Sequence, residues 1–429
     1  MNSMQRATIQ DPVSPASSER VDEEVRCLAC GTAEVEMFLD LGSTALANKF
    51  LTDAELARPE ARYPLRVGFC RACGHVQLTE TVPPDAMFTD YLYVSAASDT
   101  LREHFDDLSR TLAERHGLGA DDLVIDIGCN DGSLLGSFAD LGVRTLGVDP
   151  AENLAELAKQ SGIERYVGFF GGDTAGEIVE RWGEAALITA TNTFPHIPDL
   201  EGFLKGIDMA LVPGGRFVVE AHYLVDLFDQ LAFDTVYHEH VSYWALGPMC
   251  RLFERHGLQV VDAERLPIHH GQLRVTVQRH GEGVVDPSVD RILEMERDRG
   301  IGRLETWQGF ADRVLGIKRD LLSTLHELKA QGSRLAGYGA PAKGSTLLEF
   351  LEIGPELLDF IADRSTLKQG RHTPGSHIPI VPPDRLMTDR PDYVLLLAWN
   401  FVDEIMAQQR AYREAGGKFI LPVPAVSIL

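Results

Sequence analysis

The chain has 429 residues, which is too long for one ordinary domain and predicts two or three. Its composition, 44% hydrophobic and 24% charged, is that of a soluble globular protein. The net charge of −24 opposes contact with a polyanion, so we expect no nucleic-acid partner, although a local basic pocket could hold one phosphorylated small molecule. No apolar run approaches the roughly 18 residues that cross a membrane, and residues 1–24 lack the apolar core of a secretory signal. We expect a disordered lead-in there, and a cytoplasmic monomer without a membrane partner.

Four of the six cysteines form two matched CxxC pairs near the start of the chain. Cys27 and Cys30 belong to CLAC, Cys70 and Cys73 belong to CRAC, and a glycine follows each pair. A CxxC turn directs two thiolates at one metal ion, and glycine accepts the left-handed backbone that such a turn often needs. Two turns supply four sulfur ligands, a closed set that suits a structural Zn²⁺. We predict a zinc-binding domain over residues 25–82; unconnected thiols or a redox dithiol are the alternatives.

A glycine turn follows the first strongly apolar run of the chain. LVIDIGCNDG at 123–132 predicts a buried strand, a turn and the start of a helix, and the next apolar run, VRTLGVDP, ends in Asp149. In doubly wound folds an acidic residue about twenty positions after the turn accepts hydrogen bonds from the ribose of a nucleoside. The dinucleotide fingerprint GxGxxG is absent, and Asp131 within the turn suits the cationic, phosphate-free S-adenosylmethionine (SAM).

The turn is similar to the D-I/V-G-x-x-x-G motif of class I methyltransferases. Residues 186–199 predict a further strand with a polar loop at its end, and 202–221 predict a helix, a PGG turn and a strand, the order expected of the later half of such a sheet. We therefore expect a SAM-binding domain over residues 83–285, with another Rossmann-like domain as the alternative. The resemblance implies these SAM-binding residues: Asp126, Gly128, Asn130, Asp131, Gly132, Asp149 and Asn192.

Titratable side chains are unusually dense in FDTVYHEHVSYW, residues 233–244. On a regular strand Tyr237 and Glu239 would share a face and His240 would point away. Convergence of all three on one site requires irregular backbone at a strand end, where active-site loops lie. HEH could also bind a metal ion, but it lacks the i, i+4 spacing of a helical zinc motif and no third ligand is apparent.

The last third of the chain predicts a second α/β domain. Apolar residues recur at three-four spacing over 304–332, which indicates a long amphipathic helix, so we assign 286–332 to a helical connector. A strand, a glycine turn and a helix start follow from 334, and further strands are predicted at 357–363, 393–399 and 418–424. These elements predict a Rossmann-like domain over 333–429. Its glycine turn lacks the order of a P-loop, but backbone N–H groups there can cradle a diphosphate.

With these motifs in order, nearly everything from Arg26 onward resembles the C-methyltransferases that act on nucleotide-linked deoxysugars in antibiotic biosynthesis. The chain departs from the family pattern at HHGQLR (269–274) and EAHYLVDLF (220–228), which bears on the choice of substrate. The motifs that carry the resemblance, besides the CxxC pairs, are ALANKFL (45–51), DYLYVSAAS (90–98), IDIGCNDGS (125–133), NTFPHIPD (192–199), YHEHVSY (237–243), HGQLRV (270–275), GYGAPAKGSTLL (337–348), DRSTLKQGRHTPGSHIPI (363–380) and LLAWNF (396–401).

The family resemblance implies methylation of a TDP-4-keto-6-deoxysugar, the small-molecule partner, at the carbon beside its ketone. A base must remove a proton from that carbon before it can attack the methyl group of SAM. His240 matches the base by analogy and because an unperturbed histidine titrates near pH ~6.5. Glu239 and Tyr237 are expected as its neighbours, and His196 and Tyr91 on the sugar side.

Methylation at C3 is favoured over C5, and the nucleotide part is expected on the C-terminal domain. Two other classes of function remain as alternatives: an NAD-dependent nucleotide-sugar oxidoreductase and a zinc-stabilised binding module without catalysis. The oxidoreductase lacks GxGxxG, and the binding module leaves the YHEH motif unexplained.

Overall fold

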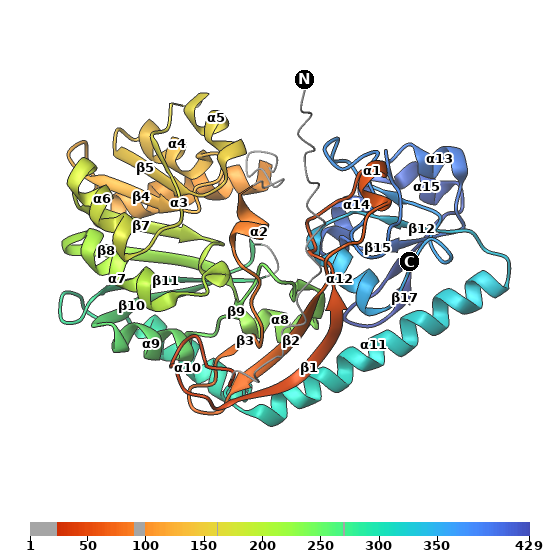
Figure 1. The fold of residues 1–429 in the computed structure, drawn as a ribbon, viewed down its shortest axis with the longest axis horizontal. Coiled ribbons are helices and arrows are strands. Elements are labelled where there is room, and N and C mark those ends of the chain that lie inside the picture. Colours follow the sequence, from red (N-terminus) through yellow and green to blue (C-terminus); the bar gives the residue numbers. More distant parts are fainter. Residues whose placement is uncertain (1–23, 90–98, 161, 269–270) are drawn as a thin grey trace, which may run out of the picture.

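The computed structural model describes residues 24–89, 99–160, 162–268 and 271–429, and they form three units, each built on its own sheet (Figure 1). The N-terminal unit has a four-stranded sheet, the central unit a seven-stranded sheet and the C-terminal unit a six-stranded sheet. No helix among these residues is long and apolar enough to span a bilayer.

The central sheet has the strand order β10-β11-β8-β7-β4-β5-β6, and only β11 is antiparallel to its neighbours. Its strands are β4 (Leu123–Ile127), β5 (Arg144–Asp149), β6 (Arg165–Val167), β7 (Ala185–Thr191), β8 (Leu211–His222), β10 (Leu258–Leu266) and β11 (Gln272–Arg279). The predicted strand at 123–127 and the helix that starts at Ser133 are both present.

Helices cover both faces of the central sheet, because successive side chains of a strand point to opposite sides. On β4, Val124 packs with Leu112 and Leu135 of one helical layer, whereas Ile125 packs in the larger core with Ile178 and Leu204 of the other. The helices are α3 (Asp99–His116), α4 (Ser133–Asp140), α5 (Glu152–Gln160), α6 (Gly172–Trp182), α7 (Leu200–Ala210), α8 (Leu224–Gln230) and α9 (Leu246–Arg255), with 3-10 turns η2 (Phe194–His196) and η3 (Phe233–Thr235).

The C-terminal sheet has the order β14-β13-β12-β15-β16-β17 and is parallel except at β17. The strand predicted over 357–363 is shorter in the structure, where only two of its residues pair. The elements are β12 (Leu335–Tyr338), α12 (Ala342–Phe350), β13 (Ile361–Ala362), β14 (Ile380–Val381), α13 (Arg385–Asp389), β15 (Tyr393–Leu396), η5 (Trp399–Phe401), α14 (Val402–Gln408), α15 (Arg410–Glu414), β16 (Lys418–Leu421) and β17 (Ser427–Ile428).

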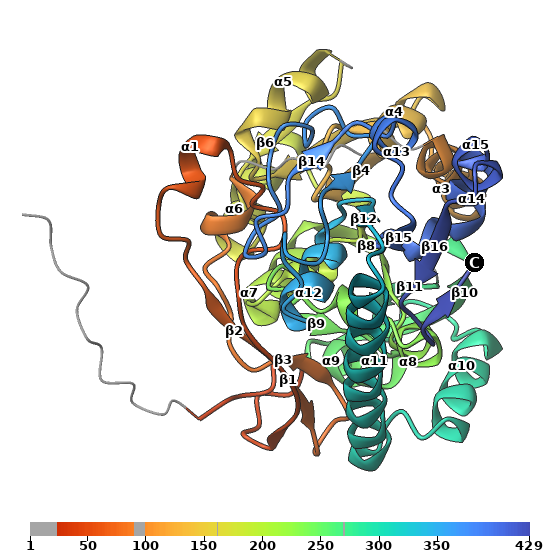
Figure 2. The ribbon, with the colours of Figure 1, turned by 90° about the vertical axis from the view of Figure 1, so that its right-hand side faces the viewer.

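The long helix α11 (Leu304–Ala330) runs below the central and C-terminal units and links them (Figures 1 and 2). It follows α10 (Pro287–Asp298). The eight positions of its predicted apolar stripe are all buried: Leu304, Trp307, Phe310, Val314, Ile317, Leu321, Leu325 and Leu328. This continuous buried stripe makes α11 part of the larger hydrophobic core, which the central and C-terminal units share.

The N-terminal unit contacts both of the others. Its antiparallel sheet is β1 (Val35–Thr44), β2 (Tyr63–Cys70), β3 (Val76–Leu78) and β9 (Ser242–Tyr243), with the short helices α1 (Asp53–Leu56) and α2 (Asp85–Phe88). Strand β9 comes from the central unit, where Tyr243 pairs with Val76. On the other side Arg62 lies 2.6 Å from the carboxylate of Glu349 on α12. The N-terminal sheet therefore holds two other parts of the chain. It pairs with β9, the segment just after YHEH, and it forms an ion pair with the C-terminal unit.

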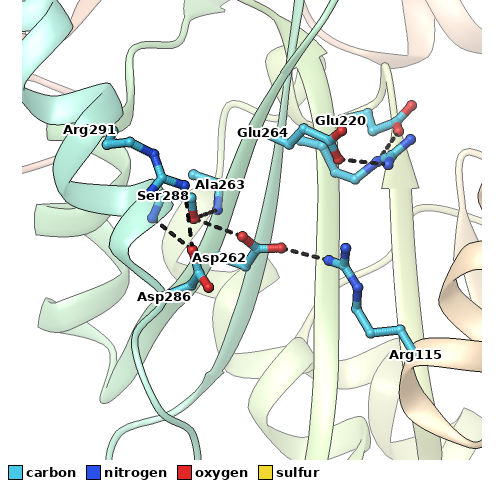
Figure 3. A network of polar contacts seen from close by, with 9 residues as sticks. Arg115, Glu220, Asp262, Ala263, Glu264, Asp286, Ser288 and Arg291 are labelled. Carbon is cyan, nitrogen blue, oxygen red and sulfur yellow. Dashed lines mark hydrogen bonds and ion pairs between the residues drawn. The ribbon is translucent and has the colours of Figure 1, made fainter.

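A polar network joins α3 and α10 to strands at one side of the central sheet (Figure 3). Asp262 on β10 accepts from Arg115 at 2.7 Å and from Ser288 Oγ at 2.8 Å. On β8 the buried carboxylate of Glu220 accepts from Arg274 at 2.6 Å and contacts His104 Nε2 at 2.7 Å. Burial acts to raise the pKa of Glu220, but His104 and Arg274 hold this pKa below its usual value. Glu220 therefore stays ionised beneath the strand end that carries His222.

Candidate active site

A single cavity of about 790 Å³ lies between the central and C-terminal units. Its central wall comes from the carboxyl ends of four parallel strands, β4, β5, β7 and β8. Its opposite wall comes from the start of α12, from residues 365–368 and from Trp399. Doubly wound sheets bind ligands outside the carboxyl ends of their strands, so this cavity is the candidate active site.

Four of the seven predicted SAM-binding residues line the cavity: Gly128, Asn130, Asp149 and Asn192. Gly128 has φ of +74°, and a Cβ built there would lie 2.0 Å from Thr193 Oγ1. Any other residue would therefore push the turn away from the loop after β7. The glycine brings backbone atoms of both loops to the edge of the cavity.

Asp149 is held at the end of β5 by the protein itself. Its Oδ2 accepts from the backbone N–H of Asn130 at 2.9 Å, and its Oδ1 accepts from Ala151 N–H and from Arg165, both at 2.8 Å. Burial raises the pKa of this carboxyl, and those three donors oppose the shift. A carboxylate has about four lone-pair sites, so these contacts leave about one free for a ribose hydroxyl.

The other three predicted residues, Asp126, Asp131 and Gly132, do not line the cavity but shape the turn behind it. Asp126 Oδ1 accepts from Thr189 Oγ1 at 2.7 Å, and burial raises the pKa of Asp126 to about 7. Asp131 Oδ1 accepts from the Ser133 hydroxyl at 2.6 Å and from its N–H at 3.1 Å, at the start of α4. Gly132 has φ of +82° at the same helix start. The carboxylate of Asp131 is therefore used within the turn.

His240 and Tyr237 line the same part of the cavity wall and contact each other. The backbone from η3 onward is irregular, as convergence requires, and His240 N–H donates to Tyr237 O at 2.9 Å. His240 Nδ1 lies 2.8 Å from Thr235 O, and its Nε2 lies 3.0 Å from the Tyr237 hydroxyl. A carbonyl only accepts, so Nδ1 carries the proton and Nε2 accepts from Tyr237. This tautomer makes Nε2 the basic nitrogen of a ring that lines the cavity.

Two further histidines surround His240. The ring centre of His196 lies 5.0 Å from that of His240, and the ring centre of His222 lies 5.3 Å from it. Burial, then the two neighbouring rings, hold the pKa of His240 well below its ordinary value. Burial also lowers the pKa of His196 to about 4. The expectation that His240 keeps an unperturbed pKa is therefore wrong, because a cationic imidazole is poorly solvated in this cluster.

His222 and Asn48 line the cavity and were not among the predicted site residues. His222 is the last residue of β8, and the rule that sites lie at carboxyl strand ends could have identified it. Asn48 Nδ2 donates to Glu239 Oε1 at 2.7 Å. Glu239 does not line the cavity; its carboxylate positions Asn48, and its carbonyl accepts from His196 Nδ1 at 2.7 Å. Tyr91 lies outside the described residues.

The C-terminal wall of the cavity carries two lysines. Lys343 Nζ lies 4.0 Å from the centre of the Trp399 ring, and Lys368 Nζ lies 4.7 Å from that of Phe50 and 2.8 Å from Ala340 O. Burial lowers the pKa of both amines, to about 8 for Lys343. These cations form a local basic site in an acidic chain, and a buried ammonium gains from an anionic ligand.

The four CxxC cysteines converge, with all Sγ atoms within 4.8 Å of one another. The Sγ atoms of Cys27 and Cys73, and those of Cys30 and Cys70, are 3.5 Å apart. Tetrahedral zinc with Zn–S bonds of about 2.3 Å separates its sulfurs by about 3.8 Å, so the cluster fits the ion after a small expansion. The glycines after the pairs have φ of +75° and +78°, as the motif predicts.

Family models match three stretches of the chain: a zinc binding domain at 27–88, a methyltransferase domain at 97–263 and a C-methyltransferase C-terminal domain at 267–424. C-methyltransferase NovU from Streptomyces niveus is 39% identical over 98% of this chain and 99% of its own. Ubiquinone biosynthesis O-methyltransferase from Methylobacterium nodulans is 32% identical over 22% of this chain and 38% of its own.

Among solved structures, magnesium protoporphyrin IX methyltransferase from Synechocystis PCC 6803 with bound SAH is 14% identical. It covers 42% of this chain and 83% of its own, with a TM-score of 0.32. The family models and the strand order confirm the expected class I methyltransferase fold, with SAM as the cofactor of that domain and Zn²⁺ as the ion of the four-cysteine cluster.

Proposed function

This chain belongs to the family of SAM-dependent C-methyltransferases, and from that premise we propose that it methylates C3 of a TDP-4-keto-6-deoxysugar during antibiotic sugar biosynthesis. The observation that carries the proposal is the cavity between the central and C-terminal units. One wall has the nucleoside-type acid Asp149, the middle has three histidines, and the far wall has two lysines. SAM needs the acid Asp149 for its ribose. A ketosugar with a diphosphate needs the histidines for its ring and the lysines for its phosphates.

In this proposal the diphosphate of the substrate binds at the C-terminal wall. Lys343 and Lys368 are the cationic side chains among the described residues that line the cavity there. Diphosphate would restore the solvation that burial removes from both amines. Residues 333–429 then hold the nucleotide and residues 83–285 hold SAM, so the sugar ring falls beside the histidines.

His240 acts as the base of the proposed reaction. Its unprotonated Nε2 takes the proton from the carbon beside the ketone, and Thr235 O stabilises the imidazolium that forms. Because Nε2 has one lone pair, the hydroxyl of Tyr237 must turn away from it before the proton transfer, and the hydroxyl can then donate to the enolate oxygen. SAM, when bound, supplies the electrophilic methyl group that the carbon attacks. His196 and Tyr91 are proposed on the sugar side, with Glu239 acting through Asn48.

We place the enzyme in the cytoplasm as a monomer, since that compartment keeps thiolate ligands reduced and one chain supplies both walls of the cavity. The test incubates the protein with SAM and a panel of TDP-4-keto sugars, and it identifies products by mass spectrometry and NMR. We expect a mass increase of one methyl group with the new carbon at C3. A new methyl group at C5 would show that the alternative carbon is methylated. If no sugar of the panel is methylated, the proposed substrate class is refuted.

A further inference from the structure

A buried carboxylate outside the cavity joins the two walls. Asp234 lies in η3, is fully buried, and accepts from Trp399 Nε1 at 2.6 Å through its Oδ2. Its Oδ1 has no hydrogen-bond partner among the described residues. Lys343 lies over the other partner, the ring of Trp399. Burial raises the pKa of Asp234, and the charge of Lys343 and the bond from Trp399 oppose that shift. The groups that make a buried aspartate tolerable here therefore lie on the C-terminal unit.

The same 3-10 turn sets the orientation of His240. Thr235, the residue after Asp234, supplies the carbonyl that accepts from His240 Nδ1 at 2.8 Å. Phe233, the residue before it, packs edge-on against Phe350 of α12 with ring centres 5.5 Å apart. Helix α12 also carries Lys343. The turn that fixes the tautomer of His240 is therefore attached to the C-terminal unit through Phe233 and through Asp234.

We infer that Asp234 is a positioning residue that, through Trp399, fastens the turn orienting His240 to the wall that carries Lys343. This inference rests on the proposed function, because it assigns Asp234 to the proton-removal step. Without the Asp234–Trp399 bond the turn keeps the apolar contact of Phe233 with α12 and the attraction between Asp234 and Lys343, but it loses its hydrogen bond to the C-terminal wall. Thr235 O can then leave Nδ1, and the ring can rotate or exchange tautomers. The ring proton of His240 would then no longer be held on Nδ1, and Nε2 would lose its role as the free base.

The test compares three variants of the full-length enzyme. Asp234→Leu removes the acceptor and keeps the branching at Cγ. Trp399→Phe removes the indole donor and keeps a smaller aromatic ring for Lys343, and Asp234→Asn keeps a neutral oxygen acceptor. The main readout is exchange of the proton beside the ketone with deuterated water, at saturating nucleotide sugar and without methyl transfer. Loss of a charge-assisted hydrogen bond predicts a fall of about 10- to 100-fold for Asp234→Leu and Trp399→Phe, and a smaller fall of about 2- to 5-fold for Asp234→Asn.

Two further measurements separate positioning from loss of structure. SAM affinity by calorimetry should stay within about twofold of wild type, because the side chains that interact with Asp234 in the described residues, Trp399 and Lys343, lie on the C-terminal wall. The matched control is Glu349→Gln, another buried carboxylate between units, bound to Arg62 and to Ala45 N–H at 2.9 Å. Its exchange rate should also remain within about twofold of wild type.

A double variant shows whether Asp234 acts through His240. In Asp234→Leu with His240→Asn, exchange should be no slower than in His240→Asn alone, because the base is already absent. A further loss, or wild-type exchange in both Asp234→Leu and Trp399→Phe, overturns the inference. If Asp234→Leu does not fold, Trp399→Phe and its double variant decide the question. A wild-type enzyme that methylates no ketosugar would instead refute the proposed function.

Discussion

The two ends of the cavity are built in different ways. At the SAM end, Asp149, Asn130 and Gly128 lie within a turn-helix-strand segment of about twenty residues, and the donors to Asp149 come from that segment, from Ala151 just after it and from Arg165 on the next strand. At the opposite end, the segment that carries His240 is held by all three units: Glu239 contacts Asn48, β9 pairs with β3, and Asp234 contacts Trp399. The difference teaches that cofactor binding is a local property of the central sheet, whereas the proposed proton removal would depend on the assembled molecule.

Removing the base should have the largest effect. His240→Asn is expected to lower turnover by about 10²–10⁴-fold, the usual range for loss of a general base, with SAM affinity preserved. Deuterium exchange beside the ketone should be lost with turnover. If exchange continues at the wild-type rate while methylation stops, another residue removes the proton, and His196 becomes the candidate.

Removal of zinc should affect the part of the cavity around His240 more strongly than the part that binds SAM. The N-terminal sheet includes β9, so unfolding around the cysteines frees the segment that follows His240. Cys70→Ser or chelation is expected to lower the melting temperature and the exchange rate, because binding of a structural metal ion contributes directly to folding. SAM affinity, measured on the protein that stays folded, should fall much less. Full stability and activity in a metal-free preparation would contradict a structural zinc ion.

Substitutions in the glycine turn test which carboxylate meets the cofactor. Asp149→Ala should weaken SAM binding by about 1–3 kcal/mol, because a ribose contact is lost and Arg165 loses its partner. Asp131→Asn should change SAM affinity by less than about 0.5 kcal/mol, since its oxygen serves Ser133 outside the cavity. Calorimetry on the two variants gives both values. Equal losses of SAM affinity in the two variants would show that the carboxylate of Asp131 also contacts the cofactor.

The smallest expected effect is a displaced acid limb in the pH dependence of kcat/KM. Protonation of Nε2 removes the base, and the pKa of His240 in the folded protein lies well below its ordinary value. The active, unprotonated form therefore persists to more acidic pH, and the acid limb should lie below pH ~6.5. A limb at or above that pH would show that His240 is not the titrating base, or that the His196 and His222 rings do not crowd it in solution.

The sequence by itself determined the features that arise from neighbouring residues. The CxxC-Gly pairs, the strand and glycine turn around Gly128, and the buried stripe of α11 follow from local spacing, so they could be read without coordinates. The family resemblance added roles for His240, Tyr237 and His196, and the structure places these three side chains along one cavity.

Only the tertiary structure decided the environment of those side chains. Asn48 meets Glu239 across 191 positions of sequence, and Asp234 meets Trp399 across 165. No local pattern encodes such pairs, because either partner can be satisfied elsewhere until the units pack together. The low pKa of His240 has the same origin, since burial and two neighbouring rings displace it from the value that the residue type alone predicts.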